Sequence, residues 1–238
     1  MTGDGDSLRV SVELPPGASL KMDSGGTQMA MPLWLFWSRL AASHAAQAME
    51  ARPSDAYLDA VSMALQTPGS TIDDFLPTQE QPAPVGTAEL DASLVAVVAS
   101  ALAIDGLYGA SKSLIRPPPS TASRPRRILE TLKLGFSVGR DSTRWLPELD
   151  WLFRVRDLAV HHQECLRPAV ITRVTSQTVV VSATEVEMFS APNACRAASL
   201  CAEIISTCLG NPKRATREWA EDRRRGLVAS SSPDADPT

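Results

Sequence analysis

An arginine, an aspartate and a histidine stand close together in RVRDLAVHH, the segment 154–162. If this segment is helical, the carboxylate of Asp157 can reach His161 four residues later, orient its imidazole and favour the protonated form. A histidine held in this way can act as a general acid or base, although such pairs also occur as structural contacts. The planar guanidinium of Arg156 suits a phosphate or a carboxylate. The candidate catalytic residues are therefore Arg156, Asp157 and His161.

The helix that must position these residues has two apolar faces. Pro147 suits a first helical turn, where its missing N–H has no partner to lose, so we expect the helix at about 146–164. One apolar stripe contains Trp145, Leu149, Leu152, Phe153 and Val160, and the opposite stripe contains Trp151, Val155, Leu158 and His162. Such a helix must be covered on both sides, either by two layers of its own bundle or by its bundle and a partner subunit.

Arg156 falls within the first apolar stripe, where a guanidinium is costly to bury without an anionic partner. The structural explanation is an ion pair with an acid such as Asp105 on an apolar helix upstream, and the functional explanation is a phosphate or carboxylate ligand. Arg156 and His161 lie roughly 140 degrees apart around an ideal helix. To face one phosphate they need a helix distortion, the reach of the arginine side chain, or a site shared between two chains. His162, in the second stripe, is the alternative histidine.

Arg156, the polar Asp157, three aliphatic positions and His161 resemble the motif of the HEPN superfamily, an Arg and a polar residue followed by a His. The preceding LDWLFRV and the upstream apolar AIDGLYG look like the same family, over about residues 29–225. The resemblance implies an antiparallel helix bundle that forms a homodimer through its motif helices. Active members are metal-independent endoribonucleases, in which His moves a proton and Arg stabilises charge while the RNA 2′-hydroxyl attacks the adjacent phosphate.

Two functions are compatible with this resemblance. The first is a ribonuclease, a toxin or defence effector, with RNA as substrate and an antitoxin or another protein as partner. The second is a non-catalytic HEPN-like module that binds a nucleotide, RNA or protein. The β-like residues after the motif and the N-terminal arm depart from a minimal HEPN bundle.

Basic residues concentrate in one segment of a chain whose net charge is -4. Residues 112–144 carry eight bases and two acids. This segment could hold a phosphate backbone, although a solvated face is the commoner explanation of a charge run. The candidate substrate-binding residues are Arg126 and Arg127 in this segment, with Arg154 and His162 on the motif helix.

The remaining patterns predict a mainly α protein. Residues 1–27, which include the alternating SLRVSVEL, are expected to be a flexible arm with a short strand, 28–227 a HEPN-like helical domain, and 228–238 a disordered tail. Helices are expected at 29–51, 54–66, 87–111, 126–136, 146–164 and 192–209, with a last helix that ends at 225. A mobile Pro-rich loop is expected at about 67–86 and a small β-hairpin at about 169–188.

Other chemistry is not predicted. No run of residues has metal-ligand spacing, no cofactor motif is present, and residues 106–113 (GLYGASKS) lack the glycine that precedes the lysine of a phosphate loop. The apolar run 94–104 is too short to cross a bilayer, and His44 is expected to be structural. We expect a cytoplasmic protein without a membrane partner, whose four cysteines are reduced core residues: Cys165, Cys195, Cys201 and Cys208.

Overall fold

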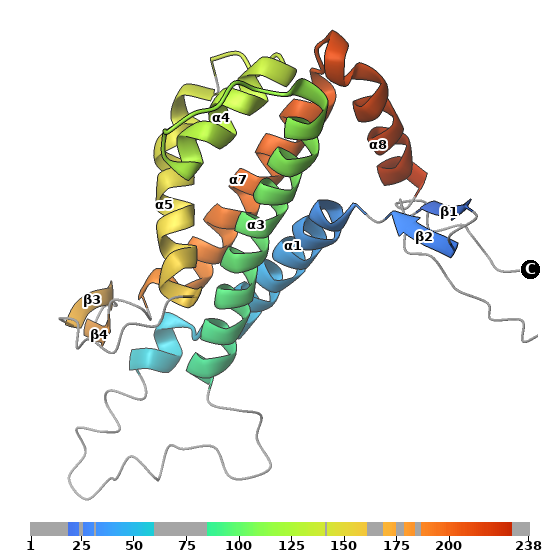
Figure 1. The fold of residues 1–238 in the computed structure, drawn as a ribbon. Helices are drawn as coiled ribbons and strands as arrows, with labels where there is room; N and C mark the ends of the chain where they lie inside the picture. Colours follow the sequence, from blue (N-terminus) through green and yellow to red (C-terminus); the bar gives the residue numbers. More distant parts are fainter. Residues whose placement is uncertain are drawn as a thin grey trace, which may run out of the picture.

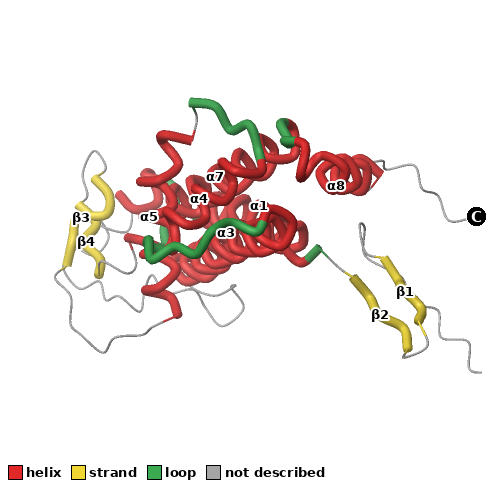
Figure 2. The backbone as a smooth tube through the Cα atoms, turned by 45° about the horizontal axis from the view of Figure 1, so that its top comes forward, coloured by secondary structure: helices red, strands yellow, loops and turns green. Residues whose placement is uncertain are grey.

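The computed structural model describes residues 19–23, 26–30, 32–59, 85–140, 142–160, 169–174, 179–183 and 187–229. Its helices are α1 (Leu33–Ala51), α3 (Val85–Ile115), α4 (Arg124–Gly135), α5 (Ser142–Val160), α7 (Ala191–Gly210) and α8 (Arg217–Ala229), with a 3-10 turn η2 (Arg214–Thr216). The strands are β1 (Ser19–Asp23), β2 (Gly26–Ala30), β3 (Ala169–Val174) and β4 (Val179–Ala183). The prediction of a mainly α protein is confirmed, as Figures 1 and 2 show.

Helix α3 lies at the centre of the bundle and packs against α1, α7, α4 and α5, with α4 near its C-terminal end and α5 at its side (Figure 1). This position follows from its sequence, which is apolar nearly all round. Val97, Ile104 and Leu107 on it are fully buried. Over 88–115 the helix is long and apolar enough to cross a membrane, but more than half of its most apolar window is buried within the protein. That burial is typical of a core helix.

The close approach of α1 to α3 depends on Gly106. A Cβ atom at this position would lie 2.8 Å from the Cβ of Trp34, whereas a Cβ at Gly109, one turn later, would meet no atom within 4 Å. A methyl group at position 106 would therefore clash with Trp34, whereas one at position 109 would meet open space.

Gly106→Ala is expected to lower the free energy of unfolding by about 1–2 kcal/mol, because the two helices must separate. Gly109→Ala, the matched control, is expected to raise it by about 0.5–1 kcal/mol, because alanine favours the helical backbone more than glycine does. Urea unfolding followed by circular dichroism measures both changes. Equal shifts in the two variants would contradict this account of the α1–α3 contact.

The N-terminal boundary of α1 differs from its prediction. The helix was expected from Met29, but Met29 and Ala30 belong to β2, which pairs with β1 in antiparallel register, and the helix begins at Leu33, directly after Pro32. Pro32 cannot donate a backbone N–H, so it suits the residue before a helix. The predicted strand SLRVSVEL lies outside the described residues.

In the middle of the chain the described helices lie where helices were predicted, and α3 is longer than expected. Ser54 caps the start of a helical turn at 55–59, since its Oγ accepts from the N–H of Tyr57 at 3.1 Å. Helix α3 begins at Val85, inside the expected loop 67–86, and the rest of that loop lies outside the described residues, as does 60–66 of the second predicted helix.

Helix α5 begins earlier than predicted. It was expected from Leu146, but it starts at Ser142, so Pro147 lies inside the helix rather than in its first turn. Gly139 turns the chain with a φ of +56°, and Ser142 Oγ donates to its carbonyl oxygen at 2.9 Å. This turn starts α5 about one helical turn before Pro147. The packing of α5 against its neighbours then compensates for a proline inside the helix.

Towards the C-terminus, β3 and β4 pair in antiparallel register, with an irregularity between Ile171 and Arg173. Helix α7 matches its predicted range within one residue at each end. Helix α8 extends to Ala229, four residues past the expected end and into the predicted tail. The remainder of that tail, 230–238, lies outside the described residues.

Two cysteines lie in the core, as predicted. Cys201 and Cys208 are buried on one face of α7, and both thiols are free. Burial raises the pKa of the Cys201 thiol to about 12 and also raises that of Cys208, because a thiolate is disfavoured away from water. Cys195 is half-buried on the same helix, and Cys165 lies outside the described residues.

Both apolar stripes of α5 are covered by the same chain. Trp145, Leu149 and Leu152 of the first stripe are fully buried, and Trp151 and Val155 of the second stripe are also buried. These residues are therefore covered by two layers of the protein's own bundle, which was the first of the two arrangements expected for this helix. Val160, at the last residue of α5, differs because 60% of it is exposed.

Candidate functional site

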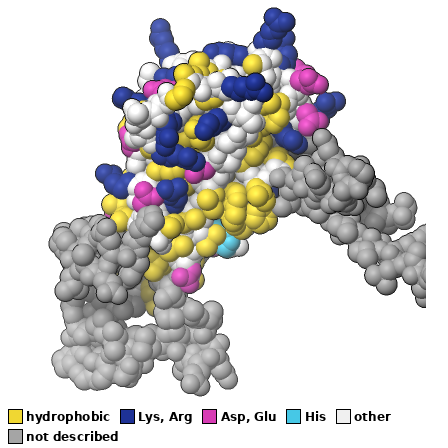
Figure 3. Space-filling view, viewed as in Figure 1, with side chains coloured by type: hydrophobic (Ala, Val, Ile, Leu, Met, Phe, Trp, Pro, Cys, Tyr) yellow, Lys and Arg dark blue, Asp and Glu magenta, His cyan; other side chains and the backbone are white. Residues whose placement is uncertain are grey.

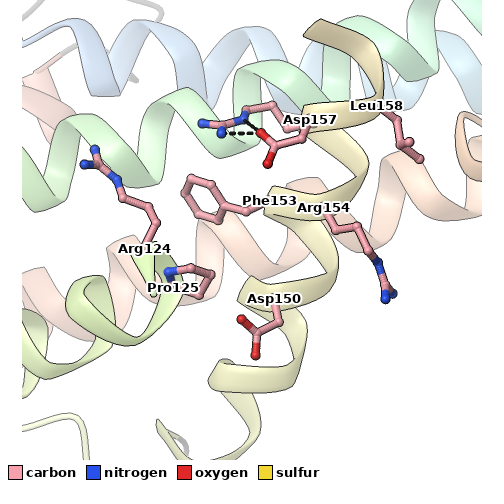
Figure 4. A pocket seen from close by; sticks show the side chains of 8 residues that line it. Arg124, Pro125, Asp150, Phe153, Arg154, Asp157 and Leu158 are labelled. Atoms are coloured by element: carbon pink, nitrogen blue, oxygen red, sulfur yellow. Dashed lines mark hydrogen bonds and ion pairs between the residues drawn. The ribbon is translucent and has the colours of Figure 1, made fainter. Parts of the chain in front are cut away.

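A groove of about 600 Å³ runs between the start of α4 and the second half of α5. Figure 4 shows it from close by, with the Phe153 ring between Arg124 and the backbone of α5. Three arginines and two aspartates line it together with Pro125, Phe153 and Leu158: Arg124, Arg154, Arg156, Asp150 and Asp157. We call it the α4–α5 groove. The predicted Arg154, Arg156 and Asp157 all line it, but Arg154 points away from the other two (Figure 4).

Arg156 is held by two carboxylates. Its Nε donates to Asp157 Oδ1 at 3.0 Å, and its Nη2 donates to the same oxygen, as the dashed lines in Figure 4 mark. Its Nη1 lies 3.6 Å from Asp105 Oδ2 on α3. The guanidinium also lies 4.9 Å from the centre of the Phe153 ring. The structural explanation for Arg156, an ion pair with Asp105, is therefore confirmed.

Asp105 links three helices through its two oxygens. Its Oδ1 accepts from Arg124 Nε, the first residue of α4, at 3.0 Å, while its Oδ2 faces Arg156 on α5. Arg124 also lies over the Tyr108 ring, at 5.0 Å. A carboxylate at this point of the mostly apolar α3 neutralises two guanidiniums that converge on it. Arg124 was not among the predicted site residues.

Asp105→Asn is expected to lower the free energy of unfolding by about 1 kcal/mol, because the amide keeps the shape of the carboxylate but loses its charge between two arginines. The effect is modest since all three side chains are partly exposed, Asp105 by 20%. The matched control is Asp91→Asn, an exposed position of the same helix. Urea unfolding measures the free energy change in both variants. An equal change would show that Asp105 does not stabilise the contact between the helices.

Asp157 was predicted to orient His161, and the structure shows that its Oδ1 accepts from Arg156. His161 and His162 lie outside the described residues, as does the predicted end of the motif helix. Nothing in the described residues therefore tests the Asp157–His161 pair.

A second groove, of about 390 Å³, lies between α3, α4 and the proline run 117–119. We call it the α3–α4 groove. Arg127 lines it together with Lys112 from α3 and Glu130 from α4. Arg126, the adjacent residue of the predicted pair, is exposed and lines neither groove. The two predicted arginines of α4 therefore differ in surroundings, because neighbours on a helix point about 100 degrees apart.

The other side of α5 is fixed to α7. Arg196 donates to both oxygens of Glu148, at 2.7 and 2.8 Å, and lies 4.0 Å from the centre of the Trp151 ring. This hydrogen-bonded guanidinium holds the pKa of the Glu148 carboxyl below its usual range. The pair sets the position of α5 and, with it, of Arg156.

Basic side chains are unevenly distributed. In Figure 3, Lys and Arg side chains gather on the upper half of the face shown, whereas hydrophobic side chains dominate lower down. Among the residues that the structure describes, no group of three or more His, Cys, Asp and Glu side chains could hold a metal ion.

No family model, no curated protein and no solved structure matches this chain.

Proposed function

We propose that this protein is a HEPN-type, metal-independent endoribonuclease with a HEPN-like antiparallel bundle, which acts in the cytoplasm as a toxin or defence effector. The observation that supports this proposal most is the position of Arg156 in the α4–α5 groove near Arg124, with which it shares Asp105. His161, the second residue of the motif, directly follows Val160, the last residue of α5. In this proposal a phosphate binds at Arg156, and His161 acts on it as the second residue of the motif.

In the proposed reaction, the 2′-hydroxyl of one nucleotide loses its proton and attacks the adjacent phosphorus. The bond to the 5′-oxygen of the next nucleotide breaks, and that oxygen takes up a proton. The products are a 2′,3′-cyclic phosphate and a 5′-hydroxyl. His161 carries one of the two proton transfers, and Arg156 stabilises the charge that develops on the phosphoryl oxygens.

Arg156 can exchange its aspartate partner for a phosphate. Half of the Asp157 side chain is exposed, and 24% of the Arg156 side chain is exposed. Ion pairs of such accessibility contribute only about 0–1 kcal/mol, because water screens them. A phosphate that also contacts neighbouring arginines is therefore a stronger partner for Arg156 than Asp157 alone.

We retain the homodimer that pairs through α5, but its contact covers less of this helix than the sequence suggested. Because Trp151 and Val155 are buried within one chain, pairing cannot use the middle of the second apolar stripe. We place the contact at the end of α5, where Val160 is exposed. Pairing there would bring two copies of His161 together, which would relieve the angular mismatch between Arg156 and His161 on one helix.

The second candidate is a non-catalytic HEPN-like module that binds a nucleotide, RNA or another protein. One observation favours it: Arg156 already has two carboxylate partners, Asp105 and Asp157. Asp105 is not itself a lining residue, but when it is counted with Asp150 and Asp157 the acids equal the three arginines of the groove in number. A balanced groove attracts a polyanion less strongly than a purely basic one.

The two candidates are separated by incubating the purified full-length chain with structured and unstructured RNAs in EDTA. Cleavage that leaves 2′,3′-cyclic phosphate ends supports the nuclease. RNA that is bound but stays intact supports the binding module. RNA that is neither bound nor cut counts against both RNA-directed functions.

A further inference from the structure

The α3–α4 groove contains cations without anionic partners. Lys112 and Arg127 line it, and neither forms an ion pair within the described part of the chain. Glu130 is the one acid among its lining residues, so the groove carries a net positive charge. The lining of the α4–α5 groove has the same net charge, but its Arg124 and Arg156 are already paired with aspartates.

Arg127 also has an unsatisfied donor. Its Nε is buried and has no hydrogen-bond acceptor among the described residues. A buried N–H without an acceptor costs free energy, which a ligand oxygen would recover once the side chain turns towards the groove that it lines. A phosphate oxygen suits this donor because it accepts charge-assisted hydrogen bonds from guanidinium and ammonium groups alike.

The two grooves meet at one pair of side chains. Tyr108 lines the α3–α4 groove, and Arg124, whose guanidinium lies 5.0 Å from the centre of the Tyr108 ring, lines the α4–α5 groove. A chain bound beside Arg156 can therefore continue past Arg124 towards Arg127.

The walls of the α3–α4 groove suit more than a bare phosphate. Pro117, Pro118 and Pro119 form one side, and Leu134, which is half exposed, lies on another. Apolar surfaces of this kind can pack against a ribose or the face of a base by burying apolar area, which carries no sequence preference.

We infer that the α3–α4 groove is a second subsite of the RNA-binding surface, in which Lys112 and Arg127 hold a phosphate of the same single strand that passes Arg156. This inference rests on RNA being the ligand proposed for the α4–α5 groove, but it does not require cleavage.

Binding is measured by fluorescence anisotropy of a labelled, single-stranded 2′-O-methyl RNA, which lacks the attacking hydroxyl, against the full chain in EDTA. Lys112→Gln and Arg127→Gln are each expected to weaken binding by about three- to tenfold. Each is also expected to reduce the slope of log affinity against log salt by about 0.7, the change for one lost phosphate contact on a single strand. Lys133→Gln, an exposed position of α4 outside both grooves, is the matched control and is expected to change affinity by less than about twofold.

Three results would overturn the inference. The first is an equal loss of affinity in all three variants, which would indicate long-range charge alone. The second is a wild type that binds no RNA. The third is binding of free AMP that the two groove variants abolish while RNA binding stays unchanged, which would indicate a nucleotide pocket. Thermal melting of each variant shows whether its fold is retained.

Failure of the proposed nuclease is distinguishable from failure of this subsite. If Lys112→Gln and Arg127→Gln weaken binding of the 2′-O-methyl strand while unmodified RNA is never cut, the subsite stands and the nuclease does not. If unmodified RNA is cut but the two variants bind as tightly as Lys133→Gln, the reverse holds.

Discussion

Replacement of His161 by alanine is expected to lower the rate of RNA cleavage in EDTA at least 100-fold, on the order of the contribution that a positioned acid or base makes to catalysis. Arg156→Ala is expected to cause a loss of similar size, because a guanidinium that stabilises charge on the phosphoryl oxygens contributes mainly in the transition state. Initial rates on one labelled RNA, at substrate concentrations well below and above KM, separate this loss from weakened binding.

The matched control is Arg140→Ala, which removes an exposed arginine outside both grooves. Its rate is expected to stay within about twofold of the wild type, since an exposed charge that lines neither groove is screened by salt. Cleavage that survives in both His161→Ala and Arg156→Ala would remove these residues from the reaction. A defect in Arg156→Ala alone, confined to KM, would assign Arg156 to binding.

Arg156→Lys separates the roles of Arg156 further. Lysine keeps the charge but cannot make two parallel hydrogen bonds to one oxyanion or to Asp157. If Arg156 acts on the phosphate, the lysine variant is expected to be nearly as inactive as the alanine variant. If it only joins helices, the lysine variant is expected to retain activity in proportion to its retained stability.

Trp145→Ala is expected to lower the free energy of unfolding by about 3–5 kcal/mol, the largest change in stability that we predict. Trp145 is fully buried in the core, and its Nε1 donates to Glu203 Oε1 on α7 at 2.7 Å. The alanine leaves both a cavity and an oxygen that has lost one donor. Chemical denaturation with urea, followed by tryptophan fluorescence and circular dichroism, measures this change.

Trp145→Phe separates the cost of the cavity from the cost of the lost hydrogen bond to Glu203. The phenyl ring fills most of the space, and Glu203 keeps its second donor, Arg144 Nη2 at 2.7 Å, so a loss of about 1–2 kcal/mol is expected. An alanine variant that loses less than about 1 kcal/mol would contradict the packing of α5 against α7 that positions Arg156.

Much of the fold was predictable because the signals for helices are local. The ranges of α4 and α7 follow from apolar periodicity and from proline near their first turns, which act within a few residues. Boundaries were predicted less well. Pro147 indicated a helix start, but the glycine turn at Gly139 and the burial of Trp145 begin α5 one turn earlier, so packing outweighed the local signal.

The partner of Arg156 was also predictable from the sequence. A guanidinium in an apolar stripe needs an anionic partner, and Asp105 is a carboxylate on a mostly apolar helix. The two residues were therefore expected to pair, and they do. The chemistry-bearing segment, its helix and the need of Arg156 for an anionic partner were therefore determined by the sequence itself, since residue type and helical period alone decide them.

Only the tertiary structure decided which basic residues share a surface. Arg124 is one of eight bases between 112 and 144, and nothing local distinguishes it, but the fold places it on Asp105. Arg126 and Arg127 are equivalent in sequence, and the packing of α4 turns only Arg127 towards the α3–α4 groove. These outcomes depend on contacts between segments distant in the chain, which helical periodicity does not encode.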